Sequence, residues 1–280
     1  MKIAVLSGKG GTGKTFISTN LANLANSKNN STYIDCDIEE PNGHLFFNSK
    51  IIKEENVNIL LPKIDINKCT NCKKCPDFCK FNAIAFPNKN PIIFKNICHS
   101  CGGCKLVCEN NAITEYEHSI GKIIYRKYNN TNIKSGILNI GETSGIPIIK
   151  KLLENTDNND NLYILDSPPG SDCSVIETVS NSDYCLIVAE PTLFGLSNFK
   201  MVYELAKKLN KPIGVIINKF IDINNPMDDY CKNNNISILT HIPYDKKIAN
   251  KISNGLLVSN DDKNFKEVFT NLLKSIKEVI

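Results

Sequence analysis

The chain has 280 residues, a formal net charge of +4 and 41% hydrophobic residues, enough for one large α/β domain and a smaller module. The charge is mild and lacks a long basic run, so we do not expect a nucleic-acid partner. No apolar run approaches the roughly 20 residues that span a bilayer, so we expect no membrane partner either. Because no signal-peptide pattern opens the chain, we expect a cytoplasmic protein.

Short runs rich in Val, Ile and Leu alternate with amphipathic segments along most of the chain. Strands are predicted at 2–6, 32–36, 162–166, 184–190, 212–218 and 236–240, and helices at 14–28, 145–154, 196–209, 245–252 and 263–279. Apolar strands separated by helices indicate a mostly parallel sheet that is covered on both faces. We therefore expect a doubly wound α/β domain.

The first turn between a predicted strand and a predicted helix carries the sequence GKGGTGKT, residues 8–15. Glycines let backbone N–H groups converge on phosphate oxygens, and this strand–loop–helix context is that of a P-loop. We expect Lys14 to reach the β- and γ-phosphates and the Thr15 hydroxyl to hold Mg²⁺. The alternative is a glycine-rich turn without a ligand, which the combination of loop, lysine and threonine disfavours. The expected phosphate-binding residues are Gly8, Lys9, Gly10, Gly11, Thr12, Gly13, Lys14 and Thr15.

Eight of the twelve cysteines lie in two copies of the pattern C-x₂-C-x₂-C-x₃-C, at 69–84 and 98–113. Disulfides are rare in a reducing cytosol, so such a cluster favours metal binding. The spacing is that of bacterial two-cluster ferredoxins, in which the fourth cysteine ligates the other cluster. The predicted ligand sets are Cys69, Cys72, Cys75 and Cys108 for one [4Fe–4S] cluster and Cys98, Cys101, Cys104 and Cys79 for the other.

Zinc is the alternative occupant of paired C-x₂-C groups, but it does not explain a third cysteine at the same interval in both copies. The duplicated segment interrupts the α/β pattern and predicts three parts of the chain. These are a P-loop domain in 1–62 and 121–280, and an inserted small α+β domain of the bacterial ferredoxin type in 63–120. The run KIIYRKY, 122–128, is predicted as a strand that leads back to the main sheet.

The loop GKGGTGKT, with Lys9 as an additional lysine, resembles the deviant Walker A loop of the MinD/ParA family. The resemblance implies that Lys9 crosses a dimer interface to the partner's nucleotide, and therefore an ATP-dependent homodimer. The segment YIDCDIEEPN resembles the family's second aspartate motif, which implies that Asp37, assisted by Asp35, orients the attacking water or contacts Mg²⁺ through water. The segment ILDSPPG resembles the Walker B strand, which implies that Asp166 faces the magnesium shell.

Two later segments resemble the adenine-contacting parts of the same family. They are IINK, 216–219, and IPYD, 242–245, which implies base contacts by Asn218, Lys219 and Pro243. Taken together, the chain resembles MinD/ParA-superfamily ATPases with an inserted two-[4Fe–4S] ferredoxin domain. The resemblance implies ATP, Mg²⁺ and two [4Fe–4S] clusters as cofactors, and as catalytic residues Lys9, Lys14, Asp37 and Asp166.

Our leading hypothesis is an ATPase that couples a nucleotide-driven dimer switch to electron transfer or redox sensing by the clusters. Its partner is expected to be an unidentified metalloprotein or the machinery that assembles that protein's cofactor. One alternative is a scaffold that assembles and transfers iron–sulfur clusters, which predicts labile clusters. The other is a positioning ATPase of the partition type, which predicts binding to DNA or to a membrane.

Overall fold

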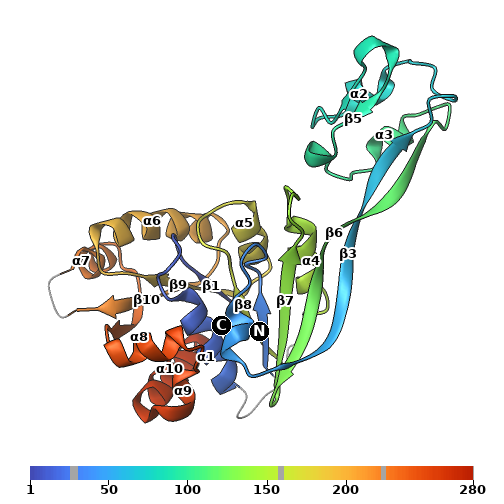
Figure 1. The fold of residues 1–280 in the computed structure, drawn as a ribbon. Coiled ribbons are helices and arrows are strands. Elements are labelled where there is room, and N and C mark those ends of the chain that lie inside the picture. Colours follow the sequence, from blue (N-terminus) through green and yellow to red (C-terminus); the bar gives the residue numbers. More distant parts are fainter. Residues whose placement is uncertain (26–30, 157–160, 222–224, 280) are drawn as a thin grey trace.

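The computed structural model describes residues 1–25, 31–156, 161–221 and 225–279. One sheet runs through the main body in the strand order β11-β10-β9-β1-β8-β2-β7-β6-β3 (Figure 1). Its strands are β1 (Lys2–Leu6), β2 (Ser31–Asp35), β3 (Lys50–Ile64), β6 (Ile113–Tyr128), β7 (Thr131–Leu138), β8 (Leu162–Asp166), β9 (Tyr184–Ala189), β10 (Ile213–Phe220) and β11 (Ile238–Pro243). Strands from β11 to β7 are parallel to their neighbours, whereas β6 and β3 are antiparallel. The expected mostly parallel α/β sheet is confirmed.

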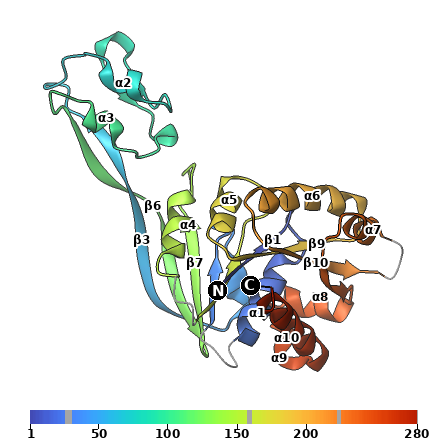
Figure 2. The ribbon, with the colours of Figure 1, turned by 180° about the vertical axis from the view of Figure 1, so that it is seen from behind.

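Helices cover both faces of this sheet (Figures 1 and 2). Helices α4 to α7 pack on one face, and α1 with α8 to α10 packs on the other. Their bounds are α1 (Lys14–Ala25), α4 (Ile146–Leu153), α5 (Cys173–Ser180), α6 (Leu193–Lys208), α7 (Pro226–Asn233), α8 (Lys246–Ser253), α9 (Val258–Asp261) and α10 (Lys263–Lys277). The last part of the helix predicted at 14–28 lies outside the described residues. Among the described helices, none combines the length and the apolar character needed to cross a membrane.

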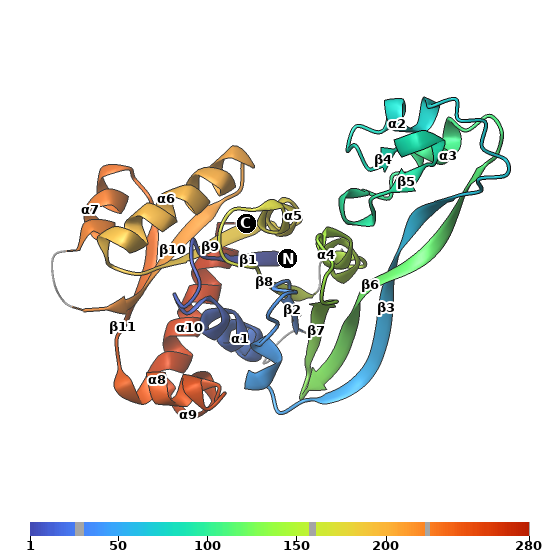
Figure 3. The ribbon, with the colours of Figure 1, turned by 45° about the horizontal axis from the view of Figure 1, so that its top comes forward.

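Strands β3 and β6 are much longer than the other strands and form an antiparallel ribbon. They pair from Lys50 opposite Lys127 to Ile64 opposite Ile113, so that the ribbon leaves the sheet and extends away from the body (Figure 3). The sequence predicted a single strand at 122–128 here, but the chain forms three, because β3 and β7 also belong to this edge. The domain boundaries predicted at 62 and 120 fall inside β3 and β6.

The far end of the ribbon carries the cysteine unit, which we define as residues 65–112 (Figure 1). The unit contains short elements only, namely α2 (Lys74–Phe78), η2 (Pro87–Lys89), η3 (Lys95–Ile97), α3 (Gly103–Leu106) and the hairpin of β4 (Ile84–Ala85) and β5 (Ile92–Ile93). Its two halves share one local conformation. The amide of Ala83 donates to Cys79 Sγ at 3.4 Å, and that of Ala112 donates to Cys108 Sγ at 3.3 Å. The internal repeat of the sequence is therefore also a repeat of the backbone.

Candidate functional site

The P-loop connects β1 to α1 at the edge where the parallel strands of the body end. Gly11 and Gly13 have φ of +77° and +97°, a region that favours glycine. A Cβ on Gly13 would lie 2.2 Å from Asn218 Nδ2, so this close approach also requires a glycine. The Asn218 amide itself donates to the Thr12 carbonyl at 2.7 Å and ties β10 to the loop.

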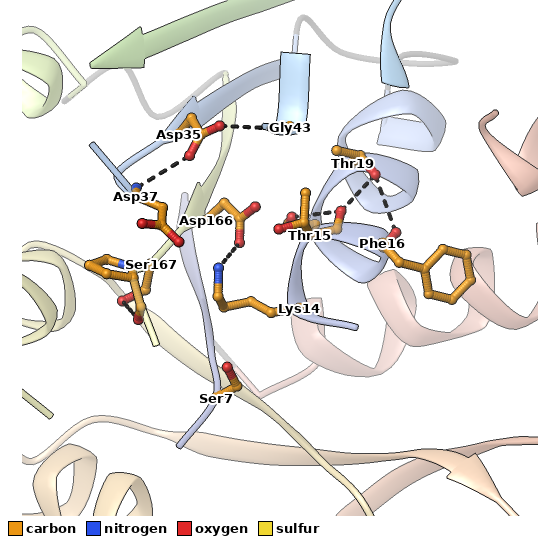
Figure 4. Close-up of polar contacts among 12 residues, drawn as sticks. Ser7, Lys14, Thr15, Phe16, Thr19, Asp35, Asp37, Gly43, Asp166 and Ser167 are labelled. Carbon is orange, nitrogen blue, oxygen red and sulfur yellow. Dashed lines mark hydrogen bonds and ion pairs between the residues drawn. The ribbon is translucent and has the colours of Figure 1, made fainter. Parts of the chain in front are cut away.

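Lys14 and Asp166 form a buried ion pair behind this loop (Figure 4). Lys14 Nζ donates to Asp166 Oδ1 at 2.8 Å, and the Tyr33 hydroxyl donates to Asp166 Oδ2 at 2.7 Å. Burial alone would lower the pKa of Lys14, but the neighbouring Asp166 carboxylate outweighs burial and raises it. The lysine therefore carries its positive charge at neutral pH, as a phosphate ligand must.

The two aspartates that follow β2 have different surroundings. Asp35 is buried, and its carboxylate accepts hydrogen bonds from the amides of Asp37 at 3.2 Å and Gly43 at 3.0 Å (Figure 4). Asp37 is half-buried and lines the cavity in front of the P-loop. Burial raises the pKa of Asp37, while the charge of Lys14 acts in the opposite direction. Asp35 thus holds the segment in place, and Asp37 is the carboxylate available to a ligand.

A third carboxylate, Glu190, follows the end of β9 and binds two lysines at once. It lies 2.5 Å from Lys9 Nζ and 2.7 Å from Lys219 Nζ, and Lys219 also donates to the Gly11 carbonyl at 2.7 Å. Burial alone would raise the pKa of Glu190, but the two lysines lower it. The sequence analysis missed Glu190, although it is the last residue of the strand predicted at 184–190, just as Asp37 directly follows the strand predicted at 32–36.

A cavity of about 890 Å³ lies in front of the loop. Of the predicted nucleotide-binding residues, those that line it are Lys9, Gly10, Gly11, Thr12, Gly13, Lys14, Thr15, Asp37, Asn218, Lys219 and Pro243. Gly8 packs against α6 instead, where a Cβ would lie 2.2 Å from the Asn198 carbonyl oxygen, and Asp166 lies behind Lys14. The opposite wall, which the sequence analysis did not identify, contains Leu45 of η1 (Gly43–Phe46) together with Ile248 and Gly255.

The eight clustered cysteines line two separate hollows in the cysteine unit. One hollow is lined by Cys69, Cys72, Cys75 and Cys108, and the other by Cys79, Cys98, Cys101 and Cys104. In the described part of the chain, no three His, Cys, Asp or Glu side chains are grouped as ligands of a single metal ion. Each set of four cysteines thus lies at its own hollow, apart from the other set.

One loop of the body reaches the cysteine unit. We call residues 139–145, between β7 and α4, the linking loop. Thr143 Oγ1 in this loop donates to the Asn96 carbonyl, two residues before Cys98, at 2.7 Å, and Glu142 bonds His118 of β6 at 2.8 Å. At the base of the loop, the amide of Leu138 donates at 2.9 Å to the carbonyl of Ile38, which follows Asp37 in sequence.

Comparisons with known proteins agree with this geometry. The model of the family "CobQ/CobB/MinD/ParA nucleotide binding domain" matches residues 3–258. The uncharacterized protein MJ0579 of Methanocaldococcus jannaschii is 32% identical over 275 residues, which cover 97% of each chain. The uncharacterized ferredoxin MJ0251 of the same organism is 40% identical over 55 residues, which cover 19% of this chain and 37% of the ferredoxin.

Solved structures share the fold at low sequence identity. The cell division ATPase MinD of Pyrococcus furiosus has a TM-score of 0.62 at 16% identity, with 100% of this chain and 99% of that chain covered. The septum site-determining protein MinD of Pyrococcus horikoshii, solved with Mg-ADP, has a TM-score of 0.63 at 16% identity, with 99% and 96% covered. The chain belongs to the CobQ/CobB/MinD/ParA family of nucleotide-binding domains.

Proposed function

We propose that this chain is an ATPase that binds and hydrolyses MgATP as a homodimer and couples that cycle to electron transfer or redox sensing by two [4Fe–4S] clusters. The observation that carries the proposal is the presence of a P-loop cavity and two four-cysteine hollows in one chain, joined by a continuous ribbon and by the linking loop. The recipient would be a partner metalloprotein or the assembly of its cofactor.

Hydrolysis would depend on positioning and charge neutralisation, as phosphoryl transfer generally does. Bound phosphates would replace Asp166 as the ion-pair partner of Lys14. Asp166 would then face the magnesium shell together with the Thr15 hydroxyl. Asp37, the carboxylate that lines the cavity, would orient the attacking water. Asp35 would hold Asp37 in place by accepting a hydrogen bond from its backbone amide.

The dimer is supported by the position of Lys9. Its side chain is 28% exposed, and its ammonium pairs with Glu190 and lies 5.1 Å from the centre of the Phe194 ring. This position is at the rim of the cavity, whereas Lys14 is buried behind the loop. Lys9 can therefore exchange Glu190 for the phosphates of a nucleotide held by a second copy, while Lys14 serves its own subunit.

The pairing of the cysteines supports clusters over single zinc ions. Zinc needs all four sulfurs at about 2.3 Å from one atom, whereas a cluster accepts thiolates distributed around its own volume. Each hollow is lined by three cysteines of one repeat and by the fourth cysteine of the other, which is the pairing of two-cluster ferredoxins. When bound, the clusters would supply one-electron transfer. The residues that would hold them are Cys69, Cys72, Cys75 and Cys108, and Cys79, Cys98, Cys101 and Cys104.

An anaerobic redox titration monitored by EPR tests the coupling, with MgATP, with MgADP and without nucleotide. We expect MgATP to shift at least one cluster potential by about 60 mV, which is tenfold for one electron, and Lys14→Ala to remove the shift. Intact clusters whose reduction potentials are the same with and without nucleotide would contradict the proposal. Cluster loss to an apo-acceptor during turnover would instead indicate the scaffold, and salt-sensitive DNA binding or ATP-dependent liposome binding would indicate a positioning ATPase.

A further inference from the structure

A second cavity of about 550 Å³ lies on the α1 face of the sheet, next to the nucleotide cavity. The two cavities share Leu45, Phe46 and Gly255 in their walls. Arg126 and Tyr128, near the end of β6, form one side of the second cavity, and His44 of η1 forms another. The functional assignments made above use neither Arg126 nor His44.

Arg126 is the only arginine of the chain, since the other 32 of the 33 Lys and Arg residues are lysines. Its Nη1 is buried and has no hydrogen-bond partner in the described part of the chain. The acidic group that acts on it is Glu54, whose carboxylate is bound by Lys122 at 2.8 Å. A guanidinium differs from an ammonium in its planar fork, which matches carboxylate and phosphate oxygens in pairs. A buried, unpaired fork nitrogen indicates a place for such an anion.

His44 supplies a second buried nitrogen to the same cavity. Its Nδ1 also has no hydrogen-bond partner among the described residues. Burial and the charge of Arg126 lower the pKa of His44, while a backbone hydrogen bond to Pro41 acts in the opposite direction. Nδ1 can donate to an anion beside the arginine when the imidazole carries two protons, or when its single proton leaves the Pro41 carbonyl. No Asp or Glu is among the described residues that line the cavity, so no carboxylate of its wall competes for these donors.

The rim of the cavity is apolar. Leu45, Ile51 and Leu256 line it and are 66%, 54% and 48% exposed. Large exposed aliphatic side chains that gather around a polar pocket are typical of a ligand site. An inorganic anion would leave these three side chains in water, whereas an anion with an apolar part would cover them.

We propose that this cavity binds a small organic anion, a carboxylate or phosphate monoester whose charged group contacts Arg126 and His44 and whose apolar part lies against Leu45, Ile51 and Leu256. The site is separate from the phosphate-binding loop and does not depend on clusters or hydrolysis. A ligand there would still act on the nucleotide site. His44 follows Gly43, which is hydrogen-bonded to Asp35 and packed against the Tyr33 hydroxyl that binds Asp166.

Isothermal titration calorimetry tests this site with phenyl phosphate, benzoate and inorganic phosphate as probes. The full chain is first saturated with MgADP, so that the P-loop cannot take the probe, and the titration is repeated with Lys14→Ala in the absence of nucleotide. We expect saturable binding of phenyl phosphate or benzoate, tighter than that of inorganic phosphate, in both backgrounds. Preference between the two organic probes decides between a phosphate and a carboxylate ligand.

Substitutions of Arg126 test whether its guanidinium group contacts the probe. Arg126→Gln is expected to weaken binding at least tenfold and Arg126→Lys by several-fold, because lysine keeps the charge and loses the fork. The neighbouring Lys127→Gln removes the same charge from an exposed position and should leave binding unchanged. Equal binding by Arg126→Gln, or no saturable binding of any probe at millimolar concentrations, would overturn the proposal. Failure of MgADP to bind would concern the nucleotide site, and the Lys14→Ala titration would remain decisive for Arg126.

Discussion

The nucleotide cavity and the cysteine unit obtain their shape in different ways. The cavity lies at the ends of fully buried strands, and its lysines are already held by carboxylates of the same chain, Lys14 by Asp166 and Lys9 by Glu190. The cysteine unit has only a small core, in which Cys75 and Ile84 pack with Ile113 of β6, and it exposes large apolar side chains such as Leu106. Protein packing shapes the first region, whereas we expect the second to depend on what its cysteines bind.

The sharpest test of this contrast is removal of iron. A structural metal contributes folding free energy directly, and a unit this small has little other core to replace it. We expect an iron-free chain to lose most hydrogen-exchange protection in residues 65–112, while the strands of the body keep theirs. Hydrogen exchange with mass spectrometry, comparing iron-loaded and chelated protein, measures both regions at once.

A matched control for this experiment is the double variant Cys185→Ala and Cys231→Ala, because these cysteines are buried in the body and line neither hollow. It removes two thiols and should retain the full iron content and the protection of the unit. Unchanged protection of residues 65–112 after chelation would show that the unit folds without its ligand, and the contrast between the two regions would be lost.

The second test concerns the charge network of the cavity. Lys14→Ala leaves the buried Asp166 without its ion-pair partner and removes the phosphate ligand, so we expect kcat for ATP hydrolysis to fall by about 10²–10³. Its control is Lys207→Ala, at the exposed end of α6, which should change kcat little. A rate for Lys14→Ala within a few-fold of the unchanged protein would show that this lysine is not part of the hydrolytic machinery.

The sequence predicted the strands and motifs of the nucleotide cavity, but not all of the contacts between residues that surround it. The strands at 2–6 and 162–166 have the predicted bounds, because buried parallel strands are continuous apolar runs with clear ends. The P-loop and the two cysteine sets could be identified because fixed spacings carry their chemistry. Glu190 was missed because its role depends on two lysines that are distant in sequence.

The ribbon could not be predicted from the same signals. Residues 50–58 contain Glu54, Glu55 and two asparagines, and most of their side chains are exposed on both faces of the strand. Pairing with β6 stabilises this segment through backbone hydrogen bonds and cross-strand pairs such as Lys122 with Glu54, and not through an apolar pattern. The linking loop is likewise defined by its tertiary contacts, such as the bond from Thr143 to Asn96.

A third test addresses the lysine that is expected to act on a second copy. Lys9→Ala should abolish the ATP-dependent dimer and leave nucleotide binding by the single chain nearly unchanged, because Lys14 still serves the phosphates. Sedimentation velocity with a non-hydrolysable ATP analogue measures the dimer fraction. The control Lys208→Ala removes an exposed charge at the end of α6 and should dimerise normally. Normal dimerisation by Lys9→Ala would show that Lys9 is not needed for the dimer and has no role beyond its ion pair with Glu190.

The smallest effect is expected where the two regions meet. Thr143→Val removes the hydrogen bond to Asn96 with little change in shape, and one such bond contributes about 0.5–1.5 kcal/mol. We expect the body to keep its melting temperature and its ATPase rate, and the MgATP-dependent shift of cluster potential to become smaller without disappearing. The control Thr114→Val makes the same change in the ribbon, where the bond to the Lys63 carbonyl is 3.5 Å long. If both variants retain the full shift, the signal passes along the ribbon alone. If only Thr143→Val loses part of it, the linking loop carries the signal between the Asp37 segment and the cysteines.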